Sequence, residues 1–239
     1  MTTKILDSVS FVQKGTGKDM VFLHGYLSSK EAFTAQINYF SRFYRVTAID
    51  FLGFGKSGAL TEPFSVTDYA HWTARVLGAL NIENPFVIAH SFGCRVAIKM
   101  SGEGIYAFDK MLLTGPAGVI LRRPLGYYIK IKAYRLCKKW FPQFAERRFG
   151  SAEYRTLSPV MRESYKKIVN EDLRKCAKQV ENPVFIIEGE EDKTTPMREA
   201  QAYAECFPQC HLQTISGGHF AFAENPTLFN LMVEEFFYV

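Results

Sequence analysis

The sequence predicts an α/β fold in which a mainly parallel central sheet is covered by helices on both faces. Short apolar runs without polar alternation, typical of strands buried on both faces, alternate along the chain with stretches of helical periodicity. The length of 239 residues, with 47% hydrophobic and 22% charged residues, fits one large globular domain. We therefore expect a single domain over residues 1–239, with one helical segment inserted in it.

The individual elements follow this rhythm from the N-terminus. Residues 4–13 alternate loosely and lead into a glycine-containing stretch, which predicts an edge hairpin. Strands are predicted at 20–23, 46–49, 86–89, 111–113, 184–187 and 212–215. Helices are predicted at 30–42, at 66–80, directly after the strand at 86–89, at 197–207 and at 227–237.

The segment at about 116–178 departs from the alternation and is expected to form a helical lid. It is rich in aromatic and basic residues, and residues 125–141 show helical periodicity. Residues 116–182 carry 16 Lys and Arg against 6 Asp and Glu, in a chain whose net charge is +5. We interpret this charge as a solvated helix face, with attraction of an anionic substrate or a membrane surface as the alternative. No nucleic-acid-binding motif accompanies it, so nucleic acid is not an expected partner.

Five polar residues directly follow predicted strands. They are His24, Asp50, Ser91, Asp192 and His219. Chemistry in parallel sheets collects at the carboxyl ends of the strands, so these five side chains are expected at one edge of the sheet.

The strand at 86–89 runs into a helix through the short turn Ala89-His90-Ser91-Phe92-Gly93. Small residues two before and two after Ser91 suit a very sharp turn, where larger side chains would collide. Such a turn exposes the serine hydroxyl at the tip of the sheet, above the N-terminus of a helix, where negative charge is favoured. By itself the pattern fits a nucleophile and a simple strand-to-helix turn equally well.

Ser91, Asp192 and His219 occur in the chain order serine, acid, histidine. In this arrangement the histidine takes the serine proton, and the acid holds the imidazole tautomer and stabilises its charged form. The order is that of α/β-hydrolases and differs from the orders in chymotrypsin and subtilisin. The backbone N–H groups of Phe92 and Tyr26 are the candidates for an oxyanion hole.

The chain resembles the α/β-hydrolase superfamily along essentially its whole length. The segments that carry the resemblance are His24-Gly25-Tyr26 for the oxyanion loop, 50–57 for the Asp-x-x-Gly-x-Gly-x-Ser turn, 89–93 for the elbow, 189–192 for the acid loop and 217–220 for the histidine loop. One departure is Ala89, where the family usually has glycine. The most similar group comprises small lidded hydrolases, among them carboxylesterases, carbon–carbon bond hydrolases and the menaquinone-pathway synthase.

Several neighbouring polar residues have competing interpretations. His24 is expected to shape the oxyanion loop by hydrogen bonding, and His90 to support the elbow. Asp50 is expected to anchor its own turn through backbone N–H groups. The alternatives to Asp192 as the acid are Glu188, Glu190 and Glu191. Asp192 is preferred because the resemblance places the acid a few residues beyond the strand.

These observations predict a serine hydrolase that cleaves carboxylic esters of small or medium apolar acyl groups. The alternatives are a carbon–carbon bond hydrolase or lyase for an anionic substrate, and a non-catalytic binding or receptor protein of the same fold. A small-molecule substrate is expected, with no cofactor and no metal. The five cysteines are scattered, and the sequence contains neither a signal-like N-terminus nor a membrane span, so we expect a cytoplasmic protein. No pattern indicates an oligomeric state.

Overall fold

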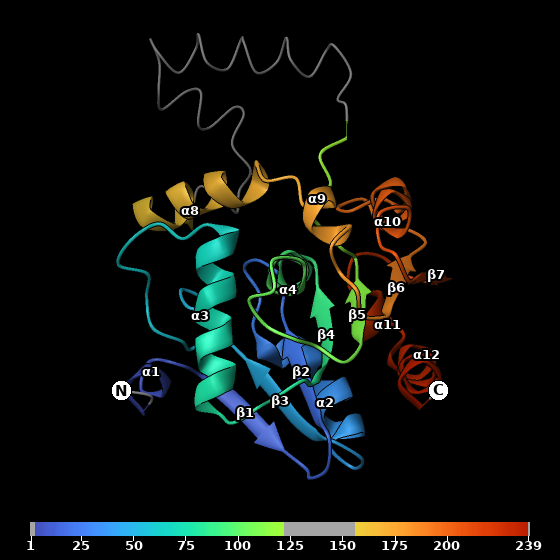
Figure 1. Cartoon of the computed structure of the whole chain (residues 1–239), viewed down its shortest axis with the longest axis horizontal. Helices are drawn as coiled ribbons and strands as arrows, with labels where there is room; N and C mark the ends of the chain where they lie inside the picture. The colour runs from blue at the N-terminus through green and yellow to red at the C-terminus, as the bar shows by residue number, and fades with distance from the viewer. Residues whose placement is uncertain (1–2, 122–155, 239) are drawn as a thin grey trace, which may run out of the picture.

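The computed structural model of the chain describes residues 3–121 and 156–238. Within these residues, seven strands form one sheet in the order β1-β3-β2-β4-β5-β6-β7 (Figure 1). The strands are β1 (Phe11–Lys14), β2 (Asp19–Leu23), β3 (Arg45–Ile49), β4 (Phe86–His90), β5 (Met111–Thr114), β6 (Val184–Gly189) and β7 (Cys210–Ile215). All neighbouring pairs are parallel except β1 with β3. The predicted α/β class and the six predicted strands are confirmed. β2 to β6 are almost entirely buried, whereas β7, at the edge of the sheet, is buried only at Ile215.

The prediction of an N-terminal edge hairpin is wrong. A short helix, α1 (Thr3–Leu6), precedes β1, and β1 pairs antiparallel with β3 in the register Phe11 to Ile49. Pairing with β2, the next strand in the chain, is not available because β2 lies between β3 and β4 and both of its edges are occupied. Of the stretch at 4–13, only residues 11–13 lie in a strand, and the partner of that strand was set by the order of the sheet.

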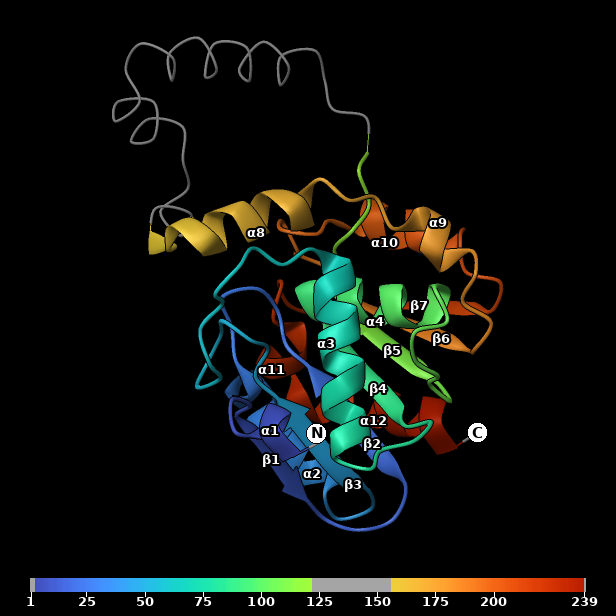
Figure 2. The same ribbon diagram turned by 60° about the vertical axis from the view of Figure 1, so that its left-hand side comes forward.

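Helices cover both faces of the sheet (Figures 1 and 2). The apolar cluster on the first face includes residues of α1, α3 (Val66–Ala79), α4 (Phe92–Gly102), α8 (Pro159–Val169), α9 (Arg174–Ala177) and α10 (Met197–Ala204). The second face carries α2 (Thr34–Phe40), α11 (Ala221–Glu224) and α12 (Pro226–Tyr238), with a 3-10 turn at Lys30–Phe33 ahead of α2. Val21 and Leu23 of β2 face the first layer, whereas Met20 and Phe22 face the second. Both sets are fully buried, which explains the continuous apolar runs in the sequence.

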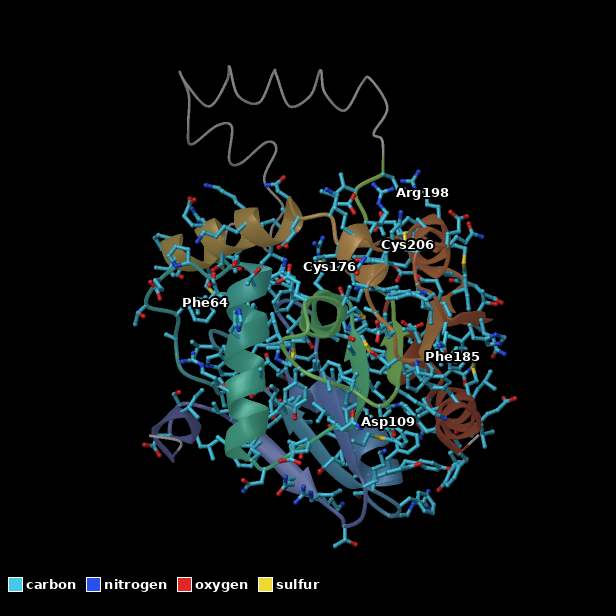
Figure 3. All side chains as sticks on the ribbon, in the orientation of Figure 1. Phe64, Asp109, Cys176, Phe185, Arg198 and Cys206 are labelled. Atoms are coloured by element: carbon cyan, nitrogen blue, oxygen red, sulfur yellow. The ribbon has the colours of Figure 1, made fainter. Side chains whose placement is uncertain are left out.

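Residues 156–178 of the predicted lid segment form α8 and α9, which lie at the end of the sheet toward which β4 points (Figure 1). Two contacts fix α8 to the body of the protein. The Phe64 N–H donates to Ser164 Oγ at 2.7 Å, and Figure 3 shows Phe64 beside α8. Buried Arg95 of α4 donates to the carbonyls of Ile168 and Glu171, at 2.9 Å each. The predicted helix at 125–141 and most of the basic residues lie outside the described residues.

Candidate active site

Ser91 lies between the last residue of β4 and the first residue of α4, in a left-handed conformation with φ 51° and ψ −106°. This conformation is rare for a residue with a side chain and costs about 1–3 kcal/mol. Its N–H donates to the Thr114 carbonyl at 3.1 Å, which ties the turn to the end of the neighbouring strand. The structure therefore places Ser91 on a strained turn at the carboxyl end of the sheet.

The chain passes very close to itself around this turn. A Cβ atom at Gly93 would lie 2.1 Å from the carbonyl oxygen of Leu23, at the end of β2. One at Gly25 would lie 2.8 Å from His90 Nδ1 and 3.4 Å from Ser91 Cβ. Both glycines are thus required by close approach, and they bring the loop after β2 against the turn at Ser91.

The two candidate oxyanion donors lie on the two segments that meet here. As the first residue of α4, Phe92 has an N–H with no acceptor inside the helix. The Tyr26 ring packs edge-on against the Phe92 ring, with centroids 5.6 Å apart. Tyr26 also packs against Tyr165 and donates its hydroxyl to the Met161 carbonyl at 3.3 Å, so α8 supports the same loop.

His24 makes two buried hydrogen bonds. Its Nδ1–H donates to the Gly25 carbonyl at 2.7 Å, and its Nε2 accepts from the Phe51 N–H at 3.0 Å. Burial lowers its pKa to about 4, so the imidazole is neutral at pH 7. Both ring nitrogens are used to hold the loop, in agreement with the prediction that His24 shapes this segment.

Asp50 likewise holds its own turn. Its carboxylate is fully buried and accepts from the Lys56 N–H at 2.9 Å, as the sequence predicted. The sequence did not reveal that Lys30 approaches the same carboxylate, with its N–H at 2.8 Å and its ammonium at 2.7 Å. These bonds join the glycine-rich turn to the loop that follows β2.

Asp192 and His219, from the loops after β6 and β7, form a close pair. His219 Nδ1 donates to Asp192 Oδ2 at 2.6 Å. The Thr195 hydroxyl donates to the same oxygen at 2.9 Å, and the N–H groups of Thr194 and Thr195 donate to Oδ1 at 2.7 and 3.0 Å. Although burial acts to raise the pKa of Asp192, these donors lower it to about 2. Asp192 is therefore a carboxylate at neutral pH.

The two loops that carry this pair are held together by backbone approach. A Cβ atom at Gly189 would lie 2.2 Å from the Gly218 carbonyl oxygen. Gly217 has φ 130°, and Glu224 of α11 accepts from the Gly218 N–H at 2.8 Å. Glu224 was not identified from the sequence, although it lies only six residues after Gly218.

His90 connects the turn at Ser91 to the histidine loop. Its Nε2–H donates to the backbone carbonyl of His219 at 2.8 Å, and the two imidazole rings lie 4.6 Å apart. Burial lowers the pKa of His90 to about 3, so it is neutral. The predicted supporting role of His90 thus has a defined partner, which is 129 residues away in the chain.

The structure brings Ser91, Asp192 and His219 to the same end of the sheet, but the Ser91 hydroxyl is not hydrogen-bonded to His219. Within residues 3–121 and 156–238, the Ser91 hydroxyl makes no hydrogen bond, and therefore none to His219. Such bonds are often long before substrate binds. His90, which precedes Ser91 in the chain, has its ring 4.6 Å from that of His219. The Asp192 to His219 bond is made.

Glu188, one of the alternative acids, is in a different state. Its side chain is fully buried at the end of β6, and neither carboxyl oxygen has a hydrogen-bond partner among the described residues. Burial and the nearby charge of Asp192 raise the pKa of Glu188 to about 9. Two neighbouring carboxyl groups thus share one negative charge, which lies on Asp192 because Asp192 has the donors.

Replacing Glu188 with glutamine is expected to change the free energy of unfolding, relative to the wild type, more favourably at neutral pH than at acid pH. The folded protein keeps the Glu188 proton up to pH of about 9, whereas the unfolded chain releases it above about 4.5, so wild-type stability falls over that range. The stability gained by Glu188→Gln should be greater at pH 7 than at pH 4 by about 3 kcal/mol. Urea unfolding at both pH values measures this difference.

The matched control is Glu191→Gln, at an exposed position three residues further along the chain. Glu191 is not a buried, protonated carboxyl group. The effect of Glu191→Gln on the free energy of unfolding should therefore not increase by about 3 kcal/mol between pH 4 and pH 7. Equal effects of Glu188→Gln at the two pH values would contradict a neutral Glu188.

None of the helices in the described parts of the chain is both long and apolar enough to cross a membrane.

Comparison with known proteins finds relatives of similar sequence and solved structures of similar fold. The AB hydrolase superfamily protein YisY of Bacillus subtilis is 24% identical over 254 residues, covering 93% of this chain and 92% of YisY. An esterase from Exiguobacterium antarcticum superposes with a TM-score of 0.77 at 21% identity, over 97% of this chain and 96% of the esterase. A meta-cleavage product hydrolase from Pseudomonas fluorescens superposes with a TM-score of 0.74 at 23% identity, over 96% of this chain and 94% of the hydrolase.

The two solved structures share the fold of this chain, including its mostly parallel sheet flanked by helices. The sequence profile of the alpha/beta hydrolase family matches residues 20–230, a range that begins in β2 and ends in α12. That match includes every candidate site residue. The chain belongs to the alpha/beta hydrolase family.

Proposed function

We propose that this protein is a serine hydrolase that cleaves carboxylic esters of small or medium apolar acyl groups, with Ser91 as nucleophile. The observation that carries the proposal is the 2.6 Å bond from His219 to the ionised Asp192, beside a serine on a strained left-handed turn. Strain of this kind collects at functional sites, because folding otherwise selects against it.

In the first half of the reaction, His219 Nε2 takes the hydroxyl proton of Ser91 as the oxygen attacks the ester carbonyl. The N–H groups of Phe92 and Tyr26 receive the negative charge that develops on the carbonyl oxygen. Asp192 stabilises the imidazolium through Nδ1. The imidazolium then gives its proton to the departing alcohol, which leaves an acyl group on Ser91.

In the second half, His219 takes a proton from a water molecule that attacks the acyl group. The same two N–H groups stabilise the second tetrahedral intermediate. Its collapse breaks the bond to Ser91, and the imidazolium returns the proton to the serine oxygen. The net reaction consumes one water and releases an acid and an alcohol, so the chain's own residues are sufficient.

Apolar side chains near the site support an apolar substrate. Leu27 follows Tyr26 and is 47% exposed, and Phe220 follows His219 and is 41% exposed. Phe220 packs against the rings of both His90 and His219. The proposal includes a helical lid over about 116–178, supported by the position of α8 against Tyr26.

The first test is labelling with a fluorophosphonate probe, which reacts with activated serines. The folded wild type should be labelled at Ser91, and Ser91→Ala should not be labelled. Ser41→Ala, in the loop between α2 and β3, removes a serine at the amino ends of the strands and should be labelled like the wild type. A folded wild type that fails to react would contradict the serine-hydrolase proposal and favour a binding protein.

The second test separates ester cleavage from carbon–carbon bond cleavage. The candidates are p-nitrophenyl esters of increasing acyl length and a ring-cleavage diketone, which represents the substrates of a meta-cleavage product hydrolase. Activity that is highest for short and medium esters supports the proposal. Activity on the diketone alone would replace it with carbon–carbon hydrolysis, the alternative favoured by the basic charge of residues 116–182.

A further inference from the structure

Thr195 lies in the loop between β6 and α10 and contacts both members of the acid and histidine pair. Its side chain is buried, with 4% of its surface exposed. Its Oγ1 lies 2.9 Å from Asp192 Oδ2 and 3.2 Å from His219 Nδ1. Its backbone N–H also donates to Asp192 Oδ1 at 3.0 Å. One residue thus holds both oxygens of the carboxylate and touches the imidazole.

The direction of these hydrogen bonds follows from the donors available. An ionised Asp192 only accepts, so the single hydroxyl proton of Thr195 is donated to Oδ2. The short distance from His219 Nδ1 to the same oxygen requires a proton on Nδ1. That N–H also faces a lone pair of Thr195 Oγ1. The hydroxyl therefore favours the imidazole tautomer that leaves Nε2 free to act as a base.

The imidazole is also restricted by backbone. A Cβ atom at Gly115 would lie 3.2 Å from His219 Cε1 and 3.3 Å from Asp192 Oδ2, so the chain after β5 packs directly against the pair.

Thr194 offers a contrast. It also donates its N–H to Asp192 Oδ1, at 2.7 Å, but its side chain is exposed. The contact that distinguishes Thr195 from its neighbour is the hydroxyl.

We propose that Thr195 is a positioning residue, whose hydroxyl fixes the Asp192 carboxylate and the His219 imidazole in the orientation that hydrolysis requires. This role rests on the proposed function of the same site. The nucleophile, base and acid of that function were all visible in the sequence. Thr195 was not, because a threonine three residues after an aspartate is a common feature of turns.

Thr195→Val removes the hydroxyl while keeping the shape of the side chain. We expect kcat for a p-nitrophenyl ester to fall about tenfold with KM changed less than about twofold, because an imidazole that is poorly oriented slows proton transfer without removing a substrate contact.

A second pair of variants isolates the hydroxyl if valine disturbs the loop. Thr195→Ser keeps the hydroxyl and Thr195→Ala lacks it, and neither has the threonine methyl group. Serine should restore kcat to within about twofold of the wild type, whereas alanine should behave like valine. The control is Thr227→Val, at an exposed position on α12, which should have wild-type kinetics. Thermal unfolding of each variant establishes that it is folded.

If Thr195→Val and Thr195→Ala keep the wild-type kcat, the proposed role of Thr195 is wrong. A wild type that fluorophosphonate does not label would instead overturn the proposed function.

Discussion

Replacing His219 with alanine is expected to reduce hydrolysis of p-nitrophenyl esters about 10,000-fold. Ser91 then has no base to take its proton, and the departing alcohol has no acid. The residual rate comes from substrate binding and from the N–H groups of Phe92 and Tyr26. The rate of fluorophosphonate labelling of Ser91 should fall together with ester hydrolysis, since both require an activated serine.

The fold should survive this substitution. The backbone carbonyl of His219 keeps its hydrogen bond from His90, and Asp192 keeps the donors from Thr194 and Thr195. His71→Ala, at an exposed position on α3, is the control and should have wild-type activity. A folded His219→Ala variant with more than a tenth of the wild-type rate would rule out His219 as the general base.

Replacing Gly93 with alanine is expected to destabilise the protein by about 3 kcal/mol or more. The added Cβ would lie 2.1 Å from the Leu23 carbonyl oxygen and 2.7 Å from the Leu23 carbonyl carbon, which are backbone atoms of a strand held on both sides. Neither β2 nor α4 can move without disrupting the sheet or the turn. Urea unfolding measures the loss, and any folded fraction should have low activity because Ser91 and Phe92 would shift with α4.

The control for this prediction is Gly78→Ala in α3, where a Cβ would meet no atom within 4 Å. Alanine is the better helix former, so this substitution should stabilise the protein by about 1 kcal/mol. The same chemical change therefore has opposite expected signs in two helices. Equal stability of Gly93→Ala and the wild type would show that the close approach of α4 to β2 does not require glycine.

Local patterns in the sequence determined the sheet and the region of the site. Buried strands have continuous apolar runs because both of their faces are covered, so the strands β2 to β6 could be found without knowledge of their partners. Parallel strands end at one edge, which brings Ser91, Asp192 and His219 to the same region once the strands are placed. The small residues around Ser91 predicted the sharp turn for a similarly local reason.

Contacts between distant segments decided the rest. The pairing of β1 with β3 depends on which edge of the sheet stays open, and that depends on all the strands together. Which of four acidic residues receives the His219 hydrogen bond depends on how the loops after β6 and β7 meet at Gly189 and Gly218. The neutral Glu188 depends on burial and on the charge of its neighbour, and the Thr195 hydroxyl acquires its role only where two loops place it against both partners. Sequence spacing records none of these distances, because each is set by the packing of segments that are far apart in the chain.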